Sequence, residues 1–490
     1  MDPAAFRAAG QHVLEWTADY LQHSERHAVL SRVEPGWIRS SLPATAPEQG
    51  ESMEAIFADF ERILLPGVTH WNHPGFLAYF ASSGSGPGVL AEFLTAALNQ
   101  QAMLWQTSPA ATELEEVVLG WLRRMLGLPE AFEGVIYDGG SASNLHALAA
   151  ALSQAVPDAA VHGLAGRKDA RQLCVYASEQ AHSSIDKAVM LLGLGRVALR
   201  KVGTDDAFRM DPGDLAAAMA ADRRAGRLPL AVVATVGTTS TGSVDPVAAI
   251  GEICRREDVW LHVDAAYGGA AAIVPDHAWV FEGVPHADSV VVNPHKWLFT
   301  PLDLSAFYCR HFDTLRRAFS LTPEYLRSDR PAEVRNLMDT GVSLGRRFRA
   351  LKLWMVLRHF GKAGLQARIA AHAHLAQQFA SWIDDDPDFE RFAPVPLSVV
   401  CFRAVPSGLA LDAEALDRLN VALLSRVNSS GEVFLSRTVL RGRVVLRLAV
   451  GHIRTTKAHV NRAWQIVRAS LADSRASCGP AASTMRGGDA

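Results

Sequence analysis

The chain has 490 residues, 49% hydrophobic and 20% charged, a balance typical of a soluble globular protein that is large enough for more than one domain. Its 48 basic and 51 acidic residues give a formal net charge of -3, and no long basic run occurs, so nucleic-acid binding is not predicted. No apolar run approaches the ~20 residues of a membrane helix.

The cysteines and the N-terminal sequence indicate a cellular compartment. The five cysteines are widely spaced and form no CxxC pair, which argues against a disulfide scaffold and against a zinc site. The sequence MDPAAFRAAG lacks the pattern of a secretion signal. We therefore expect a cytoplasmic protein that has no metal site and no membrane partner.

Residues 1–85 are predicted to form helices that are joined by proline-rich connections. Apolar residues recur at helical spacing over residues 4–24 and again over 52–66, and prolines interrupt the pattern between these stretches. A helical segment of this kind cannot bury its apolar face alone. We expect it to pack on the main body of the protein or on a second subunit.

Residues 86–345 are predicted to form a large α/β domain with a mostly parallel sheet. Short apolar runs alternate with alanine-rich helical runs, and several strands are apolar throughout, as expected when helices cover both faces. Ligands of such sheets bind beyond the carboxyl ends of the strands. The predicted strands are Val135–Tyr137, Leu173–Ala177, Ala231–Val236, Trp260–Val263, Ser289–Val292 and Ser305–Tyr308, and the predicted helices between them include Asn144–Ala155, Pro212–Ala225 and Pro246–Glu257.

Residues 346–472 are predicted to form a smaller α+β domain. A long helical stretch, Arg346–Phe379, is followed by two strand candidates, Ser398–Arg403 and Val444–Val450. The tail, 473–490, is rich in small and polar residues, and we expect it to be disordered.

An aspartate and a lysine follow two of the predicted strands. Asp264 lies in WLHVDAAY, and Lys296 lies in NPHKWLFT among apolar residues. Partial desolvation lowers the pKa of a lysine and makes its amine nucleophilic, as Schiff-base formation requires. Each residue also has an ordinary structural interpretation, as an acid that caps a turn or as a surface lysine.

Three further motifs follow predicted strands. The sequence YDGGSASNL offers backbone amides and hydroxyls to an anion, His182 in ASEQAHSS could lie flat on a planar ring, and VGTTSTGSVDP is rich in hydroxyls. Each could instead be an ordinary turn or loop. Together with Asp264 and Lys296, at one edge of one sheet, they provide the groups that pyridoxal 5′-phosphate (PLP) requires.

Longer strings resemble a known enzyme family. HVDAAYGG, NPHKWL, SSIDKA and LGRRFRALKLW are similar to the group II PLP-dependent amino-acid decarboxylases, most of all to the aromatic-L-amino-acid (DOPA/tryptophan) decarboxylases. The resemblance extends over most of the chain and includes HWNHPGFLAYF and SPAATELEEVVLGWL. It implies the PLP-dependent transferase fold type I and a carboxy-lyase that converts an aromatic L-amino acid into its amine and CO2 through an external aldimine and a quinonoid.

The resemblance also implies roles for individual residues. Lys296 would form the internal aldimine, Asp264 would pair with the pyridine nitrogen, and His182 would stack on the cofactor ring opposite Ala266. These three residues, Lys296, Asp264 and His182, are the predicted catalytic residues. The implied cofactor-binding residues are Gly140, Ser141, His182, Thr239, Asp264, Ala266, Asn293 and Lys296.

The implied substrate-binding residues are Trp71, Tyr79, Phe80, Ser82, Met103 and Gly345. Ser82 stands where the aromatic branch of the family often has threonine, and Gly345 leaves space where histidine decarboxylases tend to carry serine. Both features favour a large aromatic substrate, although core packing is an alternative role for the aromatic side chains. In the family the segment near Met103 reaches the neighbouring subunit, so the resemblance implies a homodimer with a shared active site.

One position departs from the family. Animal and plant members usually carry a tyrosine in a mobile loop before LGRRF, where it helps to protonate the quinonoid carbon, and Leu337 falls at this place. We therefore keep a second hypothesis, an aromatic aldehyde synthase, and expect His182 or a water molecule to supply the proton in a decarboxylase. A decarboxylase of another L-amino acid and a catalytically silent binding protein are further alternatives.

Overall fold

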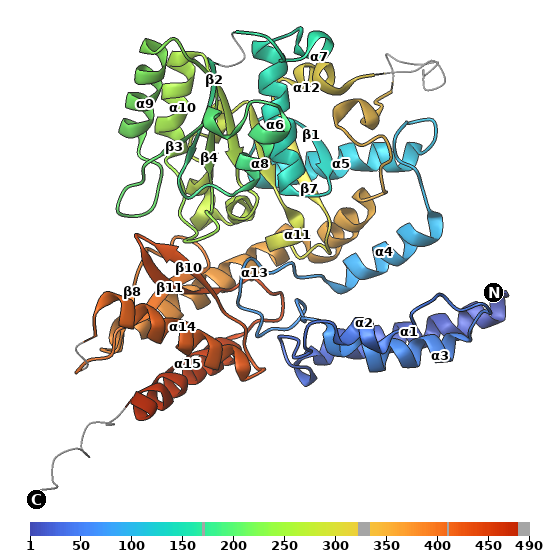
Figure 1. Cartoon of the computed structure of the whole chain (residues 1–490). Coiled ribbons are helices and arrows are strands. Elements are labelled where there is room, and N and C mark those ends of the chain that lie inside the picture. Colours follow the sequence, from blue (N-terminus) through green and yellow to red (C-terminus); the bar gives the residue numbers. More distant parts are fainter. Residues whose placement is uncertain (169–171, 322–333, 409–410, 479–490) are drawn as a thin grey trace, which may run out of the picture. The chain divides into compact units, whose positions relative to one another are not determined.

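The structure is a computed structural model that describes residues 1–168, 172–321, 334–408 and 411–478, and the side chains of 1–473 within these ranges (Figure 1). Its contacts divide the chain into two units. The first comprises Met1–Ala81, Ser381–Glu390 and Phe402–Ala490, and the second comprises Ser82–Ala380 and Arg391–Cys401. Within the described ranges, no helix combines the length and the apolarity that crossing a membrane requires.

The second unit is built on a seven-stranded sheet. β7 runs antiparallel to its neighbours β1 and β6, and all other neighbouring strands are parallel. Six strands therefore end, and β7 begins, at one edge, called here the carboxyl edge. In spatial order the strands are β1 (Glu133–Tyr137), β7 (Ser305–Cys309), β6 (Ser289–Val292), β5 (Trp260–Asp264), β4 (Leu228–Thr235), β2 (Leu173–Ser178) and β3 (Leu199–Val202).

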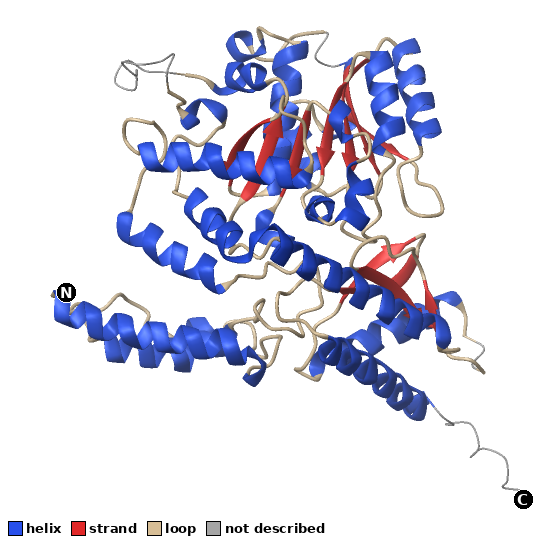
Figure 2. Ribbon diagram, turned by 180° about the vertical axis from the view of Figure 1, so that it is seen from behind, coloured by secondary structure: helices blue, strands red, loops and turns tan. Residues whose placement is uncertain are grey.

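Helices cover both faces of this sheet. α6 lies in front of the strands in Figure 1, and α5 lies in front of them in Figure 2, which is seen from behind. β2, β5, β6 and β7 are buried along their whole length, which explains their nearly continuous apolar sequences. The helices of the unit are α4 (Gly86–Leu98), α5 (Pro109–Leu126), α6 (Gly140–Ala155), α7 (Ala159–His162), α8 (Ser184–Leu191), α9 (Pro212–Arg224), α10 (Val247–Glu257), α11 (Pro294–Trp297), α12 (Phe312–Phe319) and most of α13 (Ala350–Asp385), with short 3-10 turns at Arg196–Ala198, Gly268–Ile273, Pro275–Phe281, Val284–His286 and Leu337–Thr340.

The six strands predicted for this unit are confirmed, and two helix boundaries were wrong. α6 begins at Gly140 rather than at Asn144, so the Gly-Ser sequence forms the first turn of the helix and not a loop before it. α13 begins at Ala350 rather than at Arg346, and Gly361 interrupts it with a positive φ of 61°. A glycine adopts this backbone conformation readily because it has no Cβ.

The first unit combines the N-terminal helices with the C-terminal part of the chain. A four-stranded sheet lies mostly in this unit, although Val399–Cys401 and Arg391 are grouped with the second unit. Its order is β10 (Ser436–Leu440), β11 (Arg443–Ala449), β9 (Val399–Ala404) and β8 (Phe389–Arg391). β9 and β11 match the two predicted strands, whereas β8 and β10 were not predicted. The helices are α1 (Pro3–His23), a 3-10 turn (Ser24–Arg26), α2 (Trp37–Ser41), α3 (Met53–Asp59), a π-helical turn (Phe60–Leu64), a 3-10 turn (Leu65–Gly67), α14 (Ala413–Ser429) and α15 (Lys457–Cys478).

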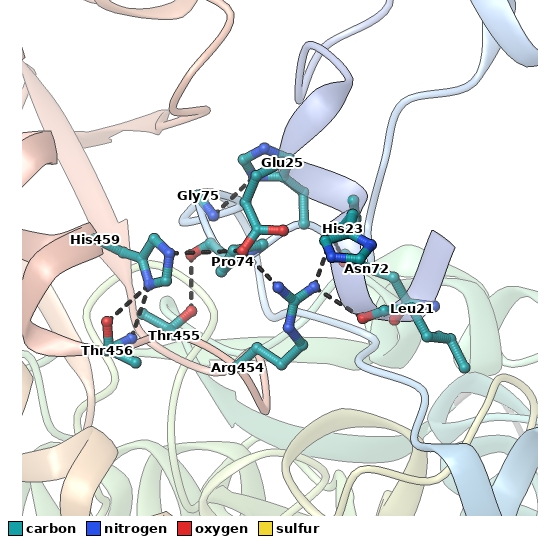
Figure 3. Close-up of polar contacts among 12 residues, drawn as sticks. Leu21, His23, Glu25, Asn72, Pro74, Gly75, Arg454, Thr455, Thr456 and His459 are labelled. Carbon is teal, nitrogen blue, oxygen red and sulfur yellow. Dashed lines mark hydrogen bonds and ion pairs between the residues drawn. The ribbon is translucent and has the colours of Figure 1, made fainter. Parts of the chain in front are cut away.

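Polar contacts join the two ends of the chain within the first unit (Figure 3). Arg454, just before α15, donates to the carbonyl of Leu21 at 2.8 Å and pairs with Glu25. Thr455 donates to the carbonyl of Pro74 at 2.8 Å. The N-terminal helices therefore pack with C-terminal elements of their own chain.

The predicted boundaries 1–85, 86–345 and 346–472 remain predictions. The contact-based units group the chain differently, because the first unit takes in most of the N-terminal segment together with C-terminal residues. Of the predicted disordered tail, 473–478 continue α15, and 479–490 lie outside the described residues.

Candidate active site

Lys296 lies in the short helix α11, directly after β6 at the carboxyl edge. Its backbone N–H donates to the carbonyl of Asn293 at 2.9 Å, and its side chain is partly exposed. The next residue, Trp297, is fully buried, stacks on Tyr267 with ring centroids 4.8 Å apart, and donates to His372 at 3.0 Å. These contacts fix α11, so the lysine extends from a rigid support.

Asp264 is the last residue of β5 and is buried. One carboxylate oxygen accepts a hydrogen bond from Nδ2 of Asn144 at 2.9 Å, and the other accepts from the backbone N–H of Ala266 at 3.1 Å. An ionised carboxylate is an acceptor only, so these two donors hold it in one orientation. The strand end thus presents a fixed acidic group at the carboxyl edge.

His182 follows β2, and its imidazole is exposed at the carboxyl edge. Nδ1 lies 2.9 Å from the hydroxyl of Ser184 and accepts the backbone N–H of the same residue at 3.2 Å. Partial desolvation lowers the pKa of His182, the charge of Lys296 lowers it further, and the charge of Asp264 opposes both effects. His182 is therefore within electrostatic reach of both Lys296 and Asp264, and its lowered pKa leaves it neutral at physiological pH.

Gly140 opens α6 against Asn293 and Ala266. A Cβ atom at Gly140 would lie 2.9 Å from Nδ2 of Asn293 and 3.6 Å from Cβ of Ala266, so a side chain here would displace Asn293. Asn293 is itself held, because its Oδ1 accepts from the hydroxyl of Ser305 at 2.6 Å and its N–H donates to the carbonyl of Ala266 at 3.0 Å. The structure thus brings these three predicted cofactor residues together.

The remaining cofactor candidates are exposed. Ser141 lies in the first turn of α6, where backbone amides have no intrahelical partner. Thr239 lies in the turn after β4, and its neighbours Thr238, Thr241 and Ser243 are buried and bonded to one another at 2.7–2.8 Å. Much of this hydroxyl-rich motif therefore stabilises its own turn, and cofactor contacts of Ser141 and Thr239 remain predictions.

Two substrate candidates, Met103 and Gly345, lie in segments that pair with each other. The carbonyl of Met103 accepts from the N–H of Met338 at 3.1 Å, and Arg346 accepts from the N–H of Ala102 at 2.8 Å. Arg346 also forms a buried ion pair with Glu115 at 2.7 Å. A bond of 3.0 Å from Arg346 to the carbonyl of Ile136 attaches both segments to the end of β1.

The other substrate candidates lie elsewhere in the chain. Ser82 is a partly exposed loop residue before α4 in the second unit. Trp71, Tyr79 and Phe80 belong to the first unit, where Trp71 stacks on Phe76 with centroids 4.3 Å apart. Phe80 is buried beneath the guanidinium of Arg447, 4.7 Å from the ring centroid, whereas Tyr79 is exposed. Substrate binding by these residues remains a prediction.

Leu337, at the position of the family tyrosine, is 1% exposed and belongs to the main hydrophobic core of the second unit. The preceding part of the predicted mobile loop, 322–333, lies outside the described residues. In this structure the Leu337 side chain is therefore a packing group.

Sequence reasoning missed three buried residues around Asp264. They are Asn144, His262 and Ser289, which are linked by bonds of 2.8 and 2.9 Å to the groups described above and to one another. A signal was available, because alternate residues of a strand point to the same face, so His262 and Asp264 must lie on one face of β5. Nothing local indicated that Asn144 would reach both of them.

The residues at the carboxyl edge fit PLP. An amine on a fixed support, a buried carboxylate, a neutral imidazole and a glycine that admits no Cβ are the groups that binding of a phosphorylated pyridine aldehyde requires. Together with a mostly parallel, helix-covered sheet, they define a PLP-dependent enzyme of fold type I.

Comparison with known proteins identifies the family. Residues 35–405 match the family described as "Pyridoxal-dependent decarboxylase conserved domain", and the chain belongs to this family. It is 41% identical to the aromatic-L-amino-acid decarboxylase of Sus scrofa (96% of this chain, 97% of the relative) and 39% identical to the phenylacetaldehyde synthase of Arabidopsis thaliana (96% of each). A solved structure of Oryza sativa TDC with PLP and tryptamine superimposes with a TM-score of 0.92 at 35% identity, covering 96% of this chain and 99% of that one. The protein is thus a PLP-dependent decarboxylase by family.

Proposed function

We propose that the enzyme decarboxylates an aromatic L-amino acid to the corresponding amine and CO2. The observation that carries the proposal is the arrangement at the carboxyl edge, where Lys296 lies on α11 after β6, the buried Asp264 ends β5, and His182 follows β2 of the same sheet. The identity of 41% to an aromatic-L-amino-acid decarboxylase over 485 residues supports the aromatic substrate class.

Each residue of this set has a distinct task. Lys296 provides the amine that holds the cofactor and yields it to the substrate amine. Bound PLP supplies an electron sink for the electron pair that remains on the substrate when CO2 departs. Asp264 keeps a proton on the pyridine nitrogen through its fixed negative charge. His182 would lie on the cofactor ring, and either His182 or a water molecule beside it would supply the proton that the substrate carbon takes up.

The cofactor and the substrate are held by further residues in this proposal. Gly140, Ser141, Thr239, Ala266 and Asn293 bind the cofactor, and the position of Gly140 against Asn293 supports a backbone approach to the phosphate. The substrate side chain is bound by Trp71, Tyr79, Phe80, Ser82, Met103 and Gly345, of which Met103 and Gly345 lie on paired segments.

An aromatic aldehyde synthase is the second candidate function. At the position of the family tyrosine, Leu337 is an apolar side chain in the core and cannot donate a proton. Its presence favours a reaction that consumes O2 and water and gives an aldehyde, CO2, ammonia and hydrogen peroxide. The identity of 39% to a phenylacetaldehyde synthase supports this alternative as well.

We further propose a homodimer that shares its active sites. α1 has no buried residue, and its Phe6 and Leu14 are 56% and 58% exposed. A groove of about 1120 Å³ is lined by α1, α3, the π-helical turn and the loop between α2 and α3, mostly with apolar side chains but also with Glu48, Glu51, Asp59 and Glu61. Apolar surface of this extent suits a second copy of the chain. If sedimentation showed a monomer and that monomer were fully active, this assembly would be excluded.

A cytoplasmic location is also part of the proposal. Among the described side chains, Cys174, Cys254, Cys309 and Cys401 are buried and none forms a disulfide, as suits a reducing compartment.

Product identification tests the proposed function. The PLP-loaded protein is incubated in air with single aromatic L-amino acids, and the products are identified by mass spectrometry. We expect an amine and released CO2. An aldehyde with peroxide would replace the first proposal with the second, and turnover of non-aromatic amino acids alone would exclude both.

A further inference from the structure

A continuous set of hydrogen bonds connects β5 with His182. It is called here the Asn144 network and comprises Trp260, Ser289, His262, Asn144, Asp264, Ser184 and His182. The successive distances are 3.0 Å (Trp260–Ser289), 2.9 Å (Ser289–His262), 2.8 Å (His262–Asn144), 2.8 Å (Asn144–Ser184) and 2.9 Å (Ser184–His182), with the branch from Asn144 to Asp264 at 2.9 Å. All of these side chains except His182 are buried. Protein groups therefore decide where each proton of the network lies.

Asp264 fixes the orientation of the Asn144 amide. Because an ionised carboxylate only accepts, the atom of Asn144 that faces Asp264 must be the NH2 group, and the same group donates to Ser184. The amide oxygen therefore faces Nε2 of His262, which must donate to it.

At the other end of the Asn144 network, Trp260 determines which atoms donate, and the result agrees with the orientation that Asp264 imposes. Its indole N–H only donates, so Ser289 accepts from it and directs its own proton to Nδ1 of His262. Burial lowers the pKa of His262 to about 4, so at neutral pH this imidazole carries one proton, on Nε2, and accepts at Nδ1.

The same donor and acceptor assignments determine which nitrogen of His182 carries a proton. The Ser184 hydroxyl accepts from Asn144, so its own proton points to Nδ1 of His182. The backbone N–H of Ser184 donates to the same nitrogen at 3.2 Å. Two donors on Nδ1 require that the single proton of neutral His182 sits on Nε2.

We propose that Asn144 is a positioning residue that fixes Asp264 directly and, through Ser184, holds His182 in the tautomer with its proton on Nε2. The inference rests on the proposed function in assigning His182 to the cofactor ring. It adds the direction in which His182 acts: Nε2 is a donor toward the reacting groups and cannot accept from them while the ring is neutral.

Nitrogen-15 spectra of the cofactor-free protein with labelled histidine test the proposal. The two ring nitrogens of His182, identified by signals that are lost in the His182→Gln variant, report which nitrogen carries the proton. At mildly alkaline pH we expect the Nε2–H tautomer to predominate strongly. Ser184→Ala removes the hydroxyl donor, so we expect the Nδ1–H population to rise, and Ser184→Thr restores the donor and the wild-type ratio.

A matched control and a second variant keep the test sharp. Ser183→Ala removes the adjacent, exposed hydroxyl and should leave the tautomer ratio unchanged. Asn144→Ala should raise the Nδ1–H population even though Ser184 is intact, and it covers the case in which Ser184→Ala does not fold. A wild-type proton on Nδ1, or a ratio that neither variant changes, would overturn the proposal. Because the spectra require no substrate, a wrong substrate class would leave them unaffected.

Discussion

Nδ2 of Asn144 lies 2.9 Å from a carboxylate oxygen of Asp264, and both side chains are buried. This contact joins the first turns of α6 to the end of β5. It holds the acidic group on which the proposed electron flow depends.

Asp264→Asn should abolish most of the activity while the protein still folds. The amide has nearly the shape of the carboxylate but cannot hold a proton on the pyridine nitrogen by its charge. We expect kcat to fall by about 10² to 10³-fold, the range typical of losing one preorganised electrostatic group. Steady-state rates at saturating PLP, with circular dichroism as the folding control, measure this. A loss below about tenfold would disprove the role of Asp264.

Gly140→Ala should weaken PLP binding. The new Cβ would lie 2.9 Å from Nδ2 of Asn293, so Asn293 must move and lose its bonds to Ser305 or Ala266. We expect an increase in the Kd for PLP, measured by fluorescence titration of the cofactor-free protein. Gly120→Ala in α5 is the matched control, because its Cβ would meet only the flexible end of Arg124 at 3.8 Å. Equal affinities in the two variants would contradict the assignment.

Arg346→Met should destabilise the second unit strongly. It leaves the carboxylate of Glu115 buried without its ion-pair partner, a change that costs about 3–5 kcal/mol. The double variant Arg346→Met/Glu115→Gln should recover part of this loss, since a neutral amide can still accept from the N–H of Ile136. Denaturant midpoints measure both effects. The neighbouring Arg347→Met, which breaks a more exposed pair with Glu92, should cost under about 1 kcal/mol.

Stability should fall as the pH drops from about 6.5 to 4, in part because of His73. Burial lowers the pKa of His73 from 6.5 to about 4, against the opposing charge of Glu25, so the unfolded chain takes up the proton first. The stabilisation is complete above pH 6.5, is lost progressively toward pH 4, and amounts to roughly 3 kcal/mol.

The variant His73→Asn isolates this contribution. An amide oxygen can still accept the N–H of Gly75, which Nδ1 of His73 accepts at 2.8 Å, but it does not titrate. Melting temperatures measured across this pH range should therefore fall less steeply in His73→Asn than in the wild type. The exposed His374→Asn serves as the control and should keep the wild-type slope. A wild-type slope in His73→Asn would show that His73 is not protonated on unfolding.

Much of the second unit could be predicted from sequence because its strands are buried on both faces. An apolar run that ends in a polar residue, as β5 ends in Asp264, identifies both a strand and a site residue. β3 was not predicted, because the two middle residues of Leu199–Val202 are basic and the strand lies at the edge of the sheet, so no apolar run marks it. Gly140 and Ser141 looked like loop residues because glycine and serine are poor helix formers, yet they form the first turn of α6.

Site residues at strand ends could be predicted from sequence, whereas residues that act through partners distant in sequence were missed. Lys296, Asp264 and His182 follow strands, and parallel topology brings strand ends together. Asn144 meets His262 across 118 positions of sequence, and no local pattern encodes such a contact. The hydroxyls around Thr239 show the opposite error. This motif suggested a ligand site, but most of its hydroxyls form hydrogen bonds with one another.

The central claim is that Lys296 carries PLP in this decarboxylase, and borohydride reduction of the PLP-loaded protein followed by tryptic peptide mass spectrometry tests it most directly. Reduction fixes the cofactor to the lysine that holds it, and trypsin no longer cleaves there. We predict one uncleaved peptide, 257–310, that carries the reduced cofactor on Lys296. Separate, unmodified peptides 257–296 and 297–310, with the cofactor on another lysine such as Lys187 or Lys352, would contradict the account.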